Sequence, residues 1–144
     1  HDQIVQLADE ALASADERKN HFETETESLK QSETQFRKVE SLKNKFKDQQ
    51  LRKLADELYV MMMNRYRSHD ELYKLYTKAI QNDKELYGMF KNKDVPLEDL
   101  ENQVKKVNEC YQNVYAENEK FNKYTEGYND KKLSFYKKAG LKPN

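Results

Sequence analysis

The sequence is poor in the residues that make turns. Only 3 glycines and 2 prolines occur among its 144 residues. Tight turns depend on glycine, proline, asparagine and aspartate at special backbone angles, so this scarcity leaves little room for hairpins or many loops. An all-β sandwich and a doubly wound α/β fold are therefore disfavoured, and a protein built from a few long helices is favoured.

Other absences exclude several functional classes. The only cysteine, Cys110, cannot form an internal disulfide, and there is no tryptophan. No apolar run approaches the roughly 20 residues that a membrane-spanning helix requires. Lysine and arginine number 26, as do aspartate and glutamate, so the net charge is zero. A dedicated nucleic-acid binder carries a strong basic excess, so no nucleic-acid partner is expected.

Apolar residues recur in alternating steps of four and three, which is the period of helices that pack along one another. This pattern predicts helices over about 2–47, 49–92 and 96–139. Asp48 is expected to cap the second helix, and Pro96 suits the first turn of the third. Gly140 and Leu141, followed by Pro143, are typical of a glycine cap at a helix C-terminus.

Short connections force neighbouring helices to run antiparallel. The second helix has two adjacent apolar seams, and a helix needs such a wide face when it contacts two neighbours. The sequence therefore predicts an all-α fold, an elongated, coiled-coil-like antiparallel three-helix bundle, with residues 1–144 as a single domain. A narrow bundle buries little surface, so we expect no deep cavity for an active site.

Residues that could perform chemistry are present but do not form a recognisable site. His1, His21 and His69 lack a second histidine or cysteine at helical ligand spacing, and Cys110 has no histidine at a catalytic spacing. Three glycines cannot build a phosphate-binding loop. We therefore expect no catalytic residue, no metal and no cofactor. Enzymatic activity is kept as a further hypothesis, and a concave site lined by convergent polar groups would favour it.

Tyrosine is the most informative residue type, with ten copies. A tyrosine ring can be buried at the rim of a narrow core while its hydroxyl stays in water, but it can also stack on a sugar or anchor a partner protein. The lysines near the C-terminus of the chain interact favourably with the negative end of the last helix. They could also contact anionic polymers. The candidate binding surface comprises Tyr59, Tyr66, Tyr73, Tyr87, Lys131 and Lys132.

The chain begins with His1, Asp2 and Gln3, without methionine and already inside an amphipathic pattern. We expect it to be part of a longer protein from which an N-terminal segment is missing.

Several stretches of helical text resemble the YkyA-type cell-wall-binding lipoproteins of Gram-positive bacteria. The resemblance extends over essentially the whole chain, although it involves no catalytic motif. The stretches are residues 2–9 (DQIVQLAD), 62–66 (MMNRY) with 72–73 (LY), 83–87 (DKELY), 120–124 (KFNKY) and 134–141 (SFYKKAGL). The resemblance implies a helical, extracytoplasmic protein tethered to the outer face of the cytoplasmic membrane by a lipidated cysteine in the missing N-terminal region. It implies no specific site residues.

Two non-enzymatic functions follow. The first is an extracytoplasmic lipoprotein that binds the cell wall or acts as an envelope spacer, with wall polymer or an envelope protein as its partner and its lost anchor as its only membrane contact. The alternative is a helical scaffold that binds a partner helix through its tyrosine-rich face. The sequence leaves the oligomeric state open.

Overall fold

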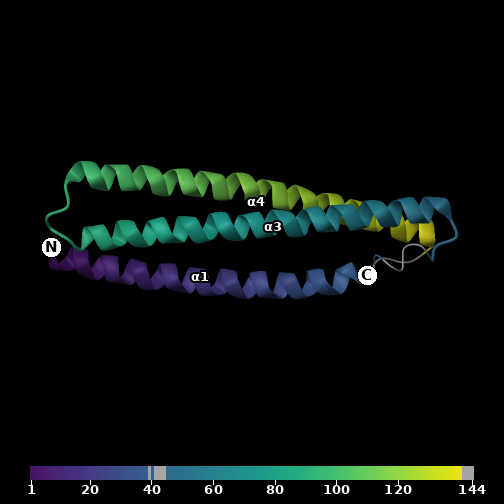
Figure 1. Ribbon diagram of the computed structural model, residues 1–144, viewed down its shortest axis with the longest axis horizontal. Helices are drawn as coiled ribbons and strands as arrows, with labels where there is room; N and C mark the ends of the chain where they lie inside the picture. Colours follow the sequence, from purple (N-terminus) through teal and green to yellow (C-terminus); the bar gives the residue numbers. More distant parts are fainter. Residues whose placement is uncertain (39, 41–44, 141–144) are drawn as a thin grey trace. The chain divides into compact units, whose positions relative to one another are not determined.

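The computed structural model describes residues 1–38, 40 and 45–140, and nearly all of these are α-helical (Figure 1). Within this described part of the chain, three long helices follow one another: α1 (Asp2–Arg37), α3 (Gln49–Phe90) and α4 (Leu97–Ala139). They contain 36, 42 and 43 residues. No strand occurs in the described residues. The all-α fold class predicted from the apolar period and the scarcity of turn residues is confirmed.

The ends of α3 and α4 are set by the residues predicted to cap them. The Asp48 carboxylate accepts hydrogen bonds from the backbone N–H groups of Gln50, at 2.7 Å, and Leu51, at 3.4 Å. These bonds satisfy two donors that have no partner within the helix. Gly140 adopts a φ of 74°, a left-handed backbone conformation that glycine tolerates because it has no Cβ atom. Its N–H donates a hydrogen bond to the Lys137 carbonyl. Both caps are confirmed, while Leu141 and Pro143 lie outside the described residues.

The first helix differs most from its predicted range. α1 ends at Arg37, whereas the apolar period predicted a helix to about residue 47. Lys38 closes a turn by donating its N–H to the Gln35 carbonyl, and residues 45–47 are not helical. The tighter bond three residues back is typical of a terminal helical turn. Residues 39 and 41–44 lie outside the described residues, whereas α3 and α4 end within two residues of their predicted bounds.

The chain divides into two compact units. Unit 1 comprises residues 1–26 and 71–117, and unit 2 comprises residues 27–70 and 118–144. Each unit thus receives a segment of all three helices. The prediction of one domain over residues 1–144 stays a prediction.

Unit 1 packs antiparallel segments around a small aliphatic core. The antiparallel direction of α1 and α3 follows from two ion pairs, in which Asp16 contacts Lys84 at 2.8 Å and Asp9 contacts Lys91 at 2.6 Å. The core is formed by Leu72, Ala79 and Val114, with Phe22, Leu75, Tyr76, Cys110 and Tyr111 packed against it. Alanine and valine at the contact points let the helix backbones approach closely.

A polar network joins all three helical segments within unit 1. Arg18 of α1 donates to the Asp83 carboxylate of α3 at 3.1 Å and to the Tyr111 hydroxyl of α4 at 2.9 Å. The Tyr111 hydroxyl in turn donates to Asp83. Asp83 is only 5% exposed, so its charge needs these partners to offset the loss of water. Burial and the bond to Asp83 raise the pKa of Tyr111 above its ordinary value.

Unit 2 has a core of long and aromatic side chains. Met62, Met63 and Tyr66 are buried, and Leu29, Phe36, Tyr59 and Tyr128 pack against them. Arg65 of α3 donates to the Thr125 hydroxyl of α4 at 2.9 Å, and its guanidinium lies 4.8 Å from the centre of the Phe121 ring. Methionine fills irregular gaps between such rings, so this core depends on ring packing rather than on an ion pair.

Candidate binding site

The six predicted binding residues are divided between the two units. Four of them belong to unit 2 and two to unit 1. Those of unit 2 are Tyr59, Tyr66, Lys131 and Lys132, and those of unit 1 are Tyr73 and Tyr87. Each unit therefore contains only part of the predicted set.

Tyr66 cannot take part in a surface site in this structure. It is 2% exposed and belongs to the core of unit 2. Its hydroxyl lies 3.0 Å from the Ser32 hydroxyl, which satisfies its hydrogen-bonding capacity inside the protein. Tyr66 is therefore a packing residue, which was the other role considered for the tyrosines.

The two tyrosines of unit 1 have separate surroundings. The ring of Tyr73 stacks on Phe22, with the ring centres 6.0 Å apart. Tyr87 lines an apolar groove of about 370 Å³ together with Phe90 of α3 and four residues of α1, namely Ile4, Leu7, Ala8 and Ala11. Ile4 and Leu7 are among the exposed large apolar side chains of the protein.

A cavity of about 270 Å³ in unit 2 includes two of the predicted residues. It brings Tyr59 of α3 and Lys132 of α4 together. The full lining comprises Phe36, Glu40, Phe46, Ala55, Leu58, Tyr59, Tyr128, Lys132, Phe135 and Tyr136. The lining includes the exposed Glu40, so the hollow is open to solvent, and the expectation of no deep cavity for an active site stays a prediction.

The cavity walls follow from helical spacing. Tyr128, Lys132, Phe135 and Tyr136 lie at positions i, i+4, i+7 and i+8, so α4 presents them on one face. Phe46, just before α3, packs edge-on against Phe135 with the ring centres 5.5 Å apart. Six of the ten lining residues are aromatic, which makes the interior a set of ring surfaces.

Polar groups are few in the lining, but they differ in chemistry. Glu40 accepts a hydrogen bond from the Tyr59 hydroxyl at 3.0 Å. The Lys132 ammonium lies 5.8 Å from the centre of the Tyr136 ring, within cation–π range. Burial raises the pKa of Tyr128 above its ordinary value, so its hydroxyl keeps its proton at neutral pH. The cavity thus offers an ammonium, a carboxylate and neutral hydroxyl groups beside its rings.

The charged residues are divided unequally between the two units. Unit 1 contains 9 basic and 16 acidic side chains, for a net charge of −7, whereas unit 2 contains 17 basic and 10 acidic side chains, for +7. The net charge of zero in the whole chain hides this division. An excess of one sign raises the local concentration of oppositely charged partners.

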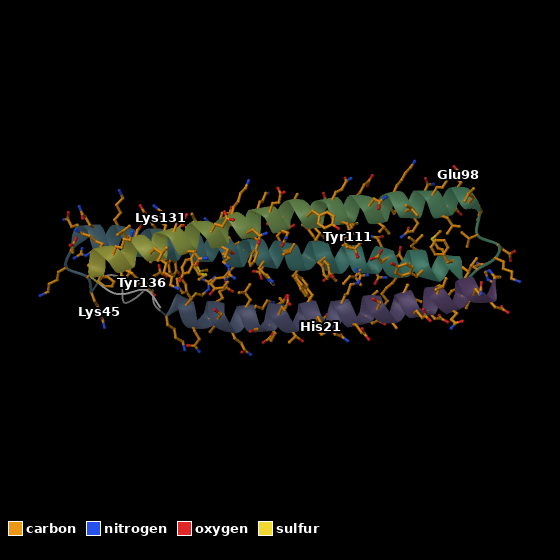
Figure 2. All side chains as sticks on the ribbon, turned by 180° about the vertical axis from the view of Figure 1, so that it is seen from behind. His21, Lys45, Glu98, Tyr111, Lys131 and Tyr136 are labelled. Atoms are coloured by element: carbon orange, nitrogen blue, oxygen red, sulfur yellow. The ribbon has the colours of Figure 1, made fainter. Side chains whose placement is uncertain are left out.

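The basic excess of unit 2 gathers beside the cavity. Residues 45–53 and 131–138 contain eight basic side chains and one acidic side chain, and they include the lining residues Phe46, Lys132, Phe135 and Tyr136. Figure 2 shows Lys45, Lys131 and Tyr136 toward the same end of unit 2. We call these two segments the basic end. Lys131 is paired with Glu57 at 2.9 Å, so its charge is partly engaged.

The structure gives no support to a metal centre in the residues it describes. No group of three histidine, cysteine or acidic side chains is placed to hold a metal ion there. His69 packs against the ring of Phe121, with the ring centres 5.5 Å apart, and Cys110 accepts a hydrogen bond from the Asn82 amide at 3.2 Å. Nor does any helix of the described residues combine the length and apolarity needed to cross a membrane.

Comparison with known proteins identifies the family. The family model described as "Putative cell-wall binding lipoprotein", YkyA, matches residues 1–138. The chain belongs to the YkyA family. It is 34% identical over 139 residues to a protein of Bacillus subtilis (strain 168) named "Uncharacterized lipoprotein YkyA". The match covers 96% of this chain but 62% of that relative, so the chain spans less than two thirds of the relative's length. No solved structure matches the chain.

The family assignment confirms the resemblance found in the sequence. It places the chain among lipoproteins described as binding the cell wall, and that description names no enzymatic activity. The family and the Bacillus subtilis relative are both described as lipoproteins.

Some residues of the cavity were not predicted as binding residues. Phe36, Phe46 and Phe135 were not among the predicted residues, because each fits the apolar period that predicts the helices. The basic residues on either side of Phe46 and Phe135 could have indicated them. Their signal appears only when net charge is counted for each segment and not for the whole chain.

Proposed function

We propose that this protein is a non-enzymatic, extracytoplasmic wall-binding module that holds an anionic wall polymer at the basic end of unit 2. The observation that carries the proposal is the concentration of eight basic side chains beside an aromatic cavity. The family description, which refers to the cell wall, supports the choice of partner.

Electrostatics favours a polyanion over a neutral polymer. Attraction between the basic end and a chain of phosphate or carboxylate groups acts over roughly 10 Å at moderate ionic strength and weakens as salt is added. Lys137 and Lys138 are exposed and available for such contacts. Lys132, within the cavity lining, extends the same charge to the rings.

The proposed location is the outer face of the cytoplasmic membrane, where a lipidated cysteine that is not among residues 1–144 would anchor the protein. The names of the family and of the Bacillus subtilis relative, which both refer to lipoproteins, support this location. The test is to express the natural full-length protein in cells fed a labelled fatty acid. Label in the membrane-bound protein is expected, and an unlabelled protein in the soluble fraction would contradict the location.

Co-sedimentation with purified wall sacculi tests the binding function. The protein is expected to sediment with intact sacculi and to be released by salt. A variant with Lys132, Lys137 and Lys138 changed to glutamine should bind at least about tenfold more weakly, which corresponds to about 1.4 kcal/mol. The matched control changes Lys74, Lys105 and Lys106, exposed lysines of unit 1, to glutamine and should bind as before.

Two further arms identify the partner. Sacculi stripped of their phosphate-containing polymers should lose the protein, and a double-stranded DNA competitor should displace it only weakly. Equal binding to stripped sacculi, or equal loss in the two triple variants, contradicts the proposal. Tighter binding to DNA than to sacculi would also contradict it.

The alternative, a scaffold that receives an amphipathic partner helix, is supported by the groove of unit 1. Its lining includes Tyr87 with the exposed side chains of Ile4 and Leu7. Under this hypothesis, the protein sediments faster when an envelope extract is added, because it binds a partner. The Leu7→Glu variant should not show this change. Under the wall-binding proposal, Leu7→Glu leaves sacculus binding unchanged.

A further inference from the structure

We propose that the aromatic cavity of unit 2 is a subsite for one sugar ring that carries, or is linked to, a phosphate group. This inference rests on the proposed function and names the part of the wall polymer that the cavity recognises. The source to which it commits is the repeating sugar-phosphate unit of the anionic wall polymer.

The size of the cavity limits what it can hold. Its volume of about 270 Å³ lies just below the usual range of sites for drug-sized ligands, which begins near 300 Å³. It therefore suits one ring-sized unit and not a longer segment of polymer. The rest of a polymer would lie along the exposed lysines of the basic end, where contacts depend on charge and not on shape.

The walls match the two kinds of surface on a sugar ring. The C–H groups on the face of a pyranose form an apolar patch that packs on an aromatic ring, and the hydroxyl groups at its edge need hydrogen-bond partners. Tyr128, Phe135 and Tyr136 offer rings from α4, and Tyr59 offers one from α3. The tyrosine hydroxyls and the Glu40 carboxylate lie in the same lining and can exchange hydrogen bonds with the edge of the ring.

The phosphate is assigned to the Lys132 side of the cavity. Lys132 is the only cationic residue in the lining, and it forms no ion pair within the part of the chain that the structure describes. An ammonium held against the Tyr136 ring attracts an anion while its alkyl stem completes the apolar wall. Lys131, by contrast, is already paired with Glu57.

An alkyl chain with an anionic head is the main rival occupant. It would contact the rings and Lys132, but its alkyl chain would form no hydrogen bond with the Tyr128 and Tyr136 hydroxyls of the lining. A sugar hydroxyl can form such bonds. The combination of phenol hydroxyls and an ammonium in a largely aromatic lining therefore favours the sugar phosphate.

The test is a titration followed by NMR of the tyrosine and phenylalanine ring signals. The probes are N-acetylglucosamine 1-phosphate, N-acetylglucosamine, inorganic phosphate and octyl phosphate. The sugar phosphate should shift the ring signals of Tyr59, Tyr128 and Tyr136 and bind at least about tenfold more tightly than the sugar or phosphate alone. The ring signal of Tyr115, which is exposed on α4 in unit 1, should not move.

Two variants separate recognition from folding. Tyr136→Ala should weaken the sugar phosphate about tenfold, whereas the matched control Tyr115→Ala leaves it unchanged. Lys132→Gln should remove the preference for the sugar phosphate over the neutral sugar while ring shifts with the neutral sugar persist, an outcome that a merely structural role would not produce. Unchanged helix content by circular dichroism shows that the variants fold.

Several results would overturn the inference. These are the absence of ring shifts with the sugar phosphate, tighter binding of octyl phosphate, or equal effects of Tyr136→Ala and Tyr115→Ala. If wild-type protein sediments with sacculi and Tyr136→Ala does so equally well, the subsite is wrong but the wall-binding function stands. If wild-type protein ignores sacculi yet binds the sugar phosphate, the proposed function fails and the subsite stands.

Discussion

Unit 1 and unit 2 are built from segments of the same three helices, yet they use different means to hold together. Unit 1 joins its segments through a buried carboxylate, an arginine and a tyrosine around small aliphatic residues. Unit 2 relies on methionine and aromatic packing, and its rings continue into an open cavity. The polar network of unit 1 specifies which side chains of the three helices pair. The aromatic packing of unit 2 leaves exposed apolar surface that a ligand can contact.

Charge follows the same division. In the acidic unit 1, some acidic side chains form ion pairs between α1 and α3, such as Asp16 with Lys84 and Asp9 with Lys91. In unit 2, Lys132, Lys137 and Lys138 of the basic end form no ion pair with another described residue, and of the three only Lys132 contacts a ring. The comparison teaches that basic residues left out of internal pairing are the ones to examine for binding.

The largest expected effect is on the core of unit 2. Tyr66→Ala removes a ring that is 2% exposed and should lower the free energy of unfolding by about 3–5 kcal/mol, because a cavity remains. Tyr66→Phe keeps the ring and loses the contact with Ser32, so it should cost about 1 kcal/mol. Urea denaturation followed by circular dichroism measures both. Equal losses would show that the hydroxyl, not ring packing, stabilises unit 2.

The next effect concerns the polar network of unit 1. Asp83→Ala leaves Arg18 and Tyr111 without their shared acceptor and should destabilise the protein by about 2–3 kcal/mol. The same denaturation experiment measures it. Lys84→Ala, which removes the more exposed pair with Asp16, is the control and should cost less than about 1 kcal/mol. If the two variants lose the same stability, the network is no more important than a surface pair.

The smallest effect appears at alkaline pH. The pKa of Tyr111 is raised above the ordinary value of 10.0 in the folded protein, first by burial and then by its bond to Asp83. Above that value the unfolded chain loses the Tyr111 proton while the folded protein keeps it. Stability is therefore complete below pH 10 and falls as pH rises through the folded pKa, by up to about 1.4 kcal/mol per pH unit for one group.

Thermal unfolding at a series of alkaline pH values measures this slope. Tyr111→Phe should flatten it, and Tyr128→Phe in unit 2 should also reduce it, because burial raises the pKa of Tyr128. Only the slope is compared, since each substitution also shifts stability at neutral pH. A slope unchanged by Tyr111→Phe would contradict the assignment of a raised pKa to its hydroxyl.

Helices and caps were predictable because they depend on local sequence. The apolar period located α3 and α4, and Asp48 and Gly140 act at the positions expected from capping chemistry. Tyr59 and Tyr66 show the limit of this reasoning. They share a helical face, but Tyr66 is in the core whereas Tyr59 lines the cavity, because burial depends on which neighbours reach each level of the helix.

The cavity and the charge division were not predictable for a related reason. Unit 1 combines residues 1–26 with 71–117, so no continuous window of sequence contains its charges, and the total for the chain cancels. Phe46 and Phe135 are far apart in sequence, and only the folded chain brings their rings together. Their aromatic character alone is equally typical of a closed core.

The division of charge has a practical consequence for anyone who purifies this protein. A chain with an isoelectric point near 7.0 should pass through ion-exchange columns at neutral pH if its charges were evenly mixed. Because unit 1 carries the acidic excess and unit 2 the basic excess, the protein should adhere to both cation- and anion-exchange resins in dilute buffer. For the same reason separate molecules attract one another at low ionic strength, and added salt keeps them apart in solution.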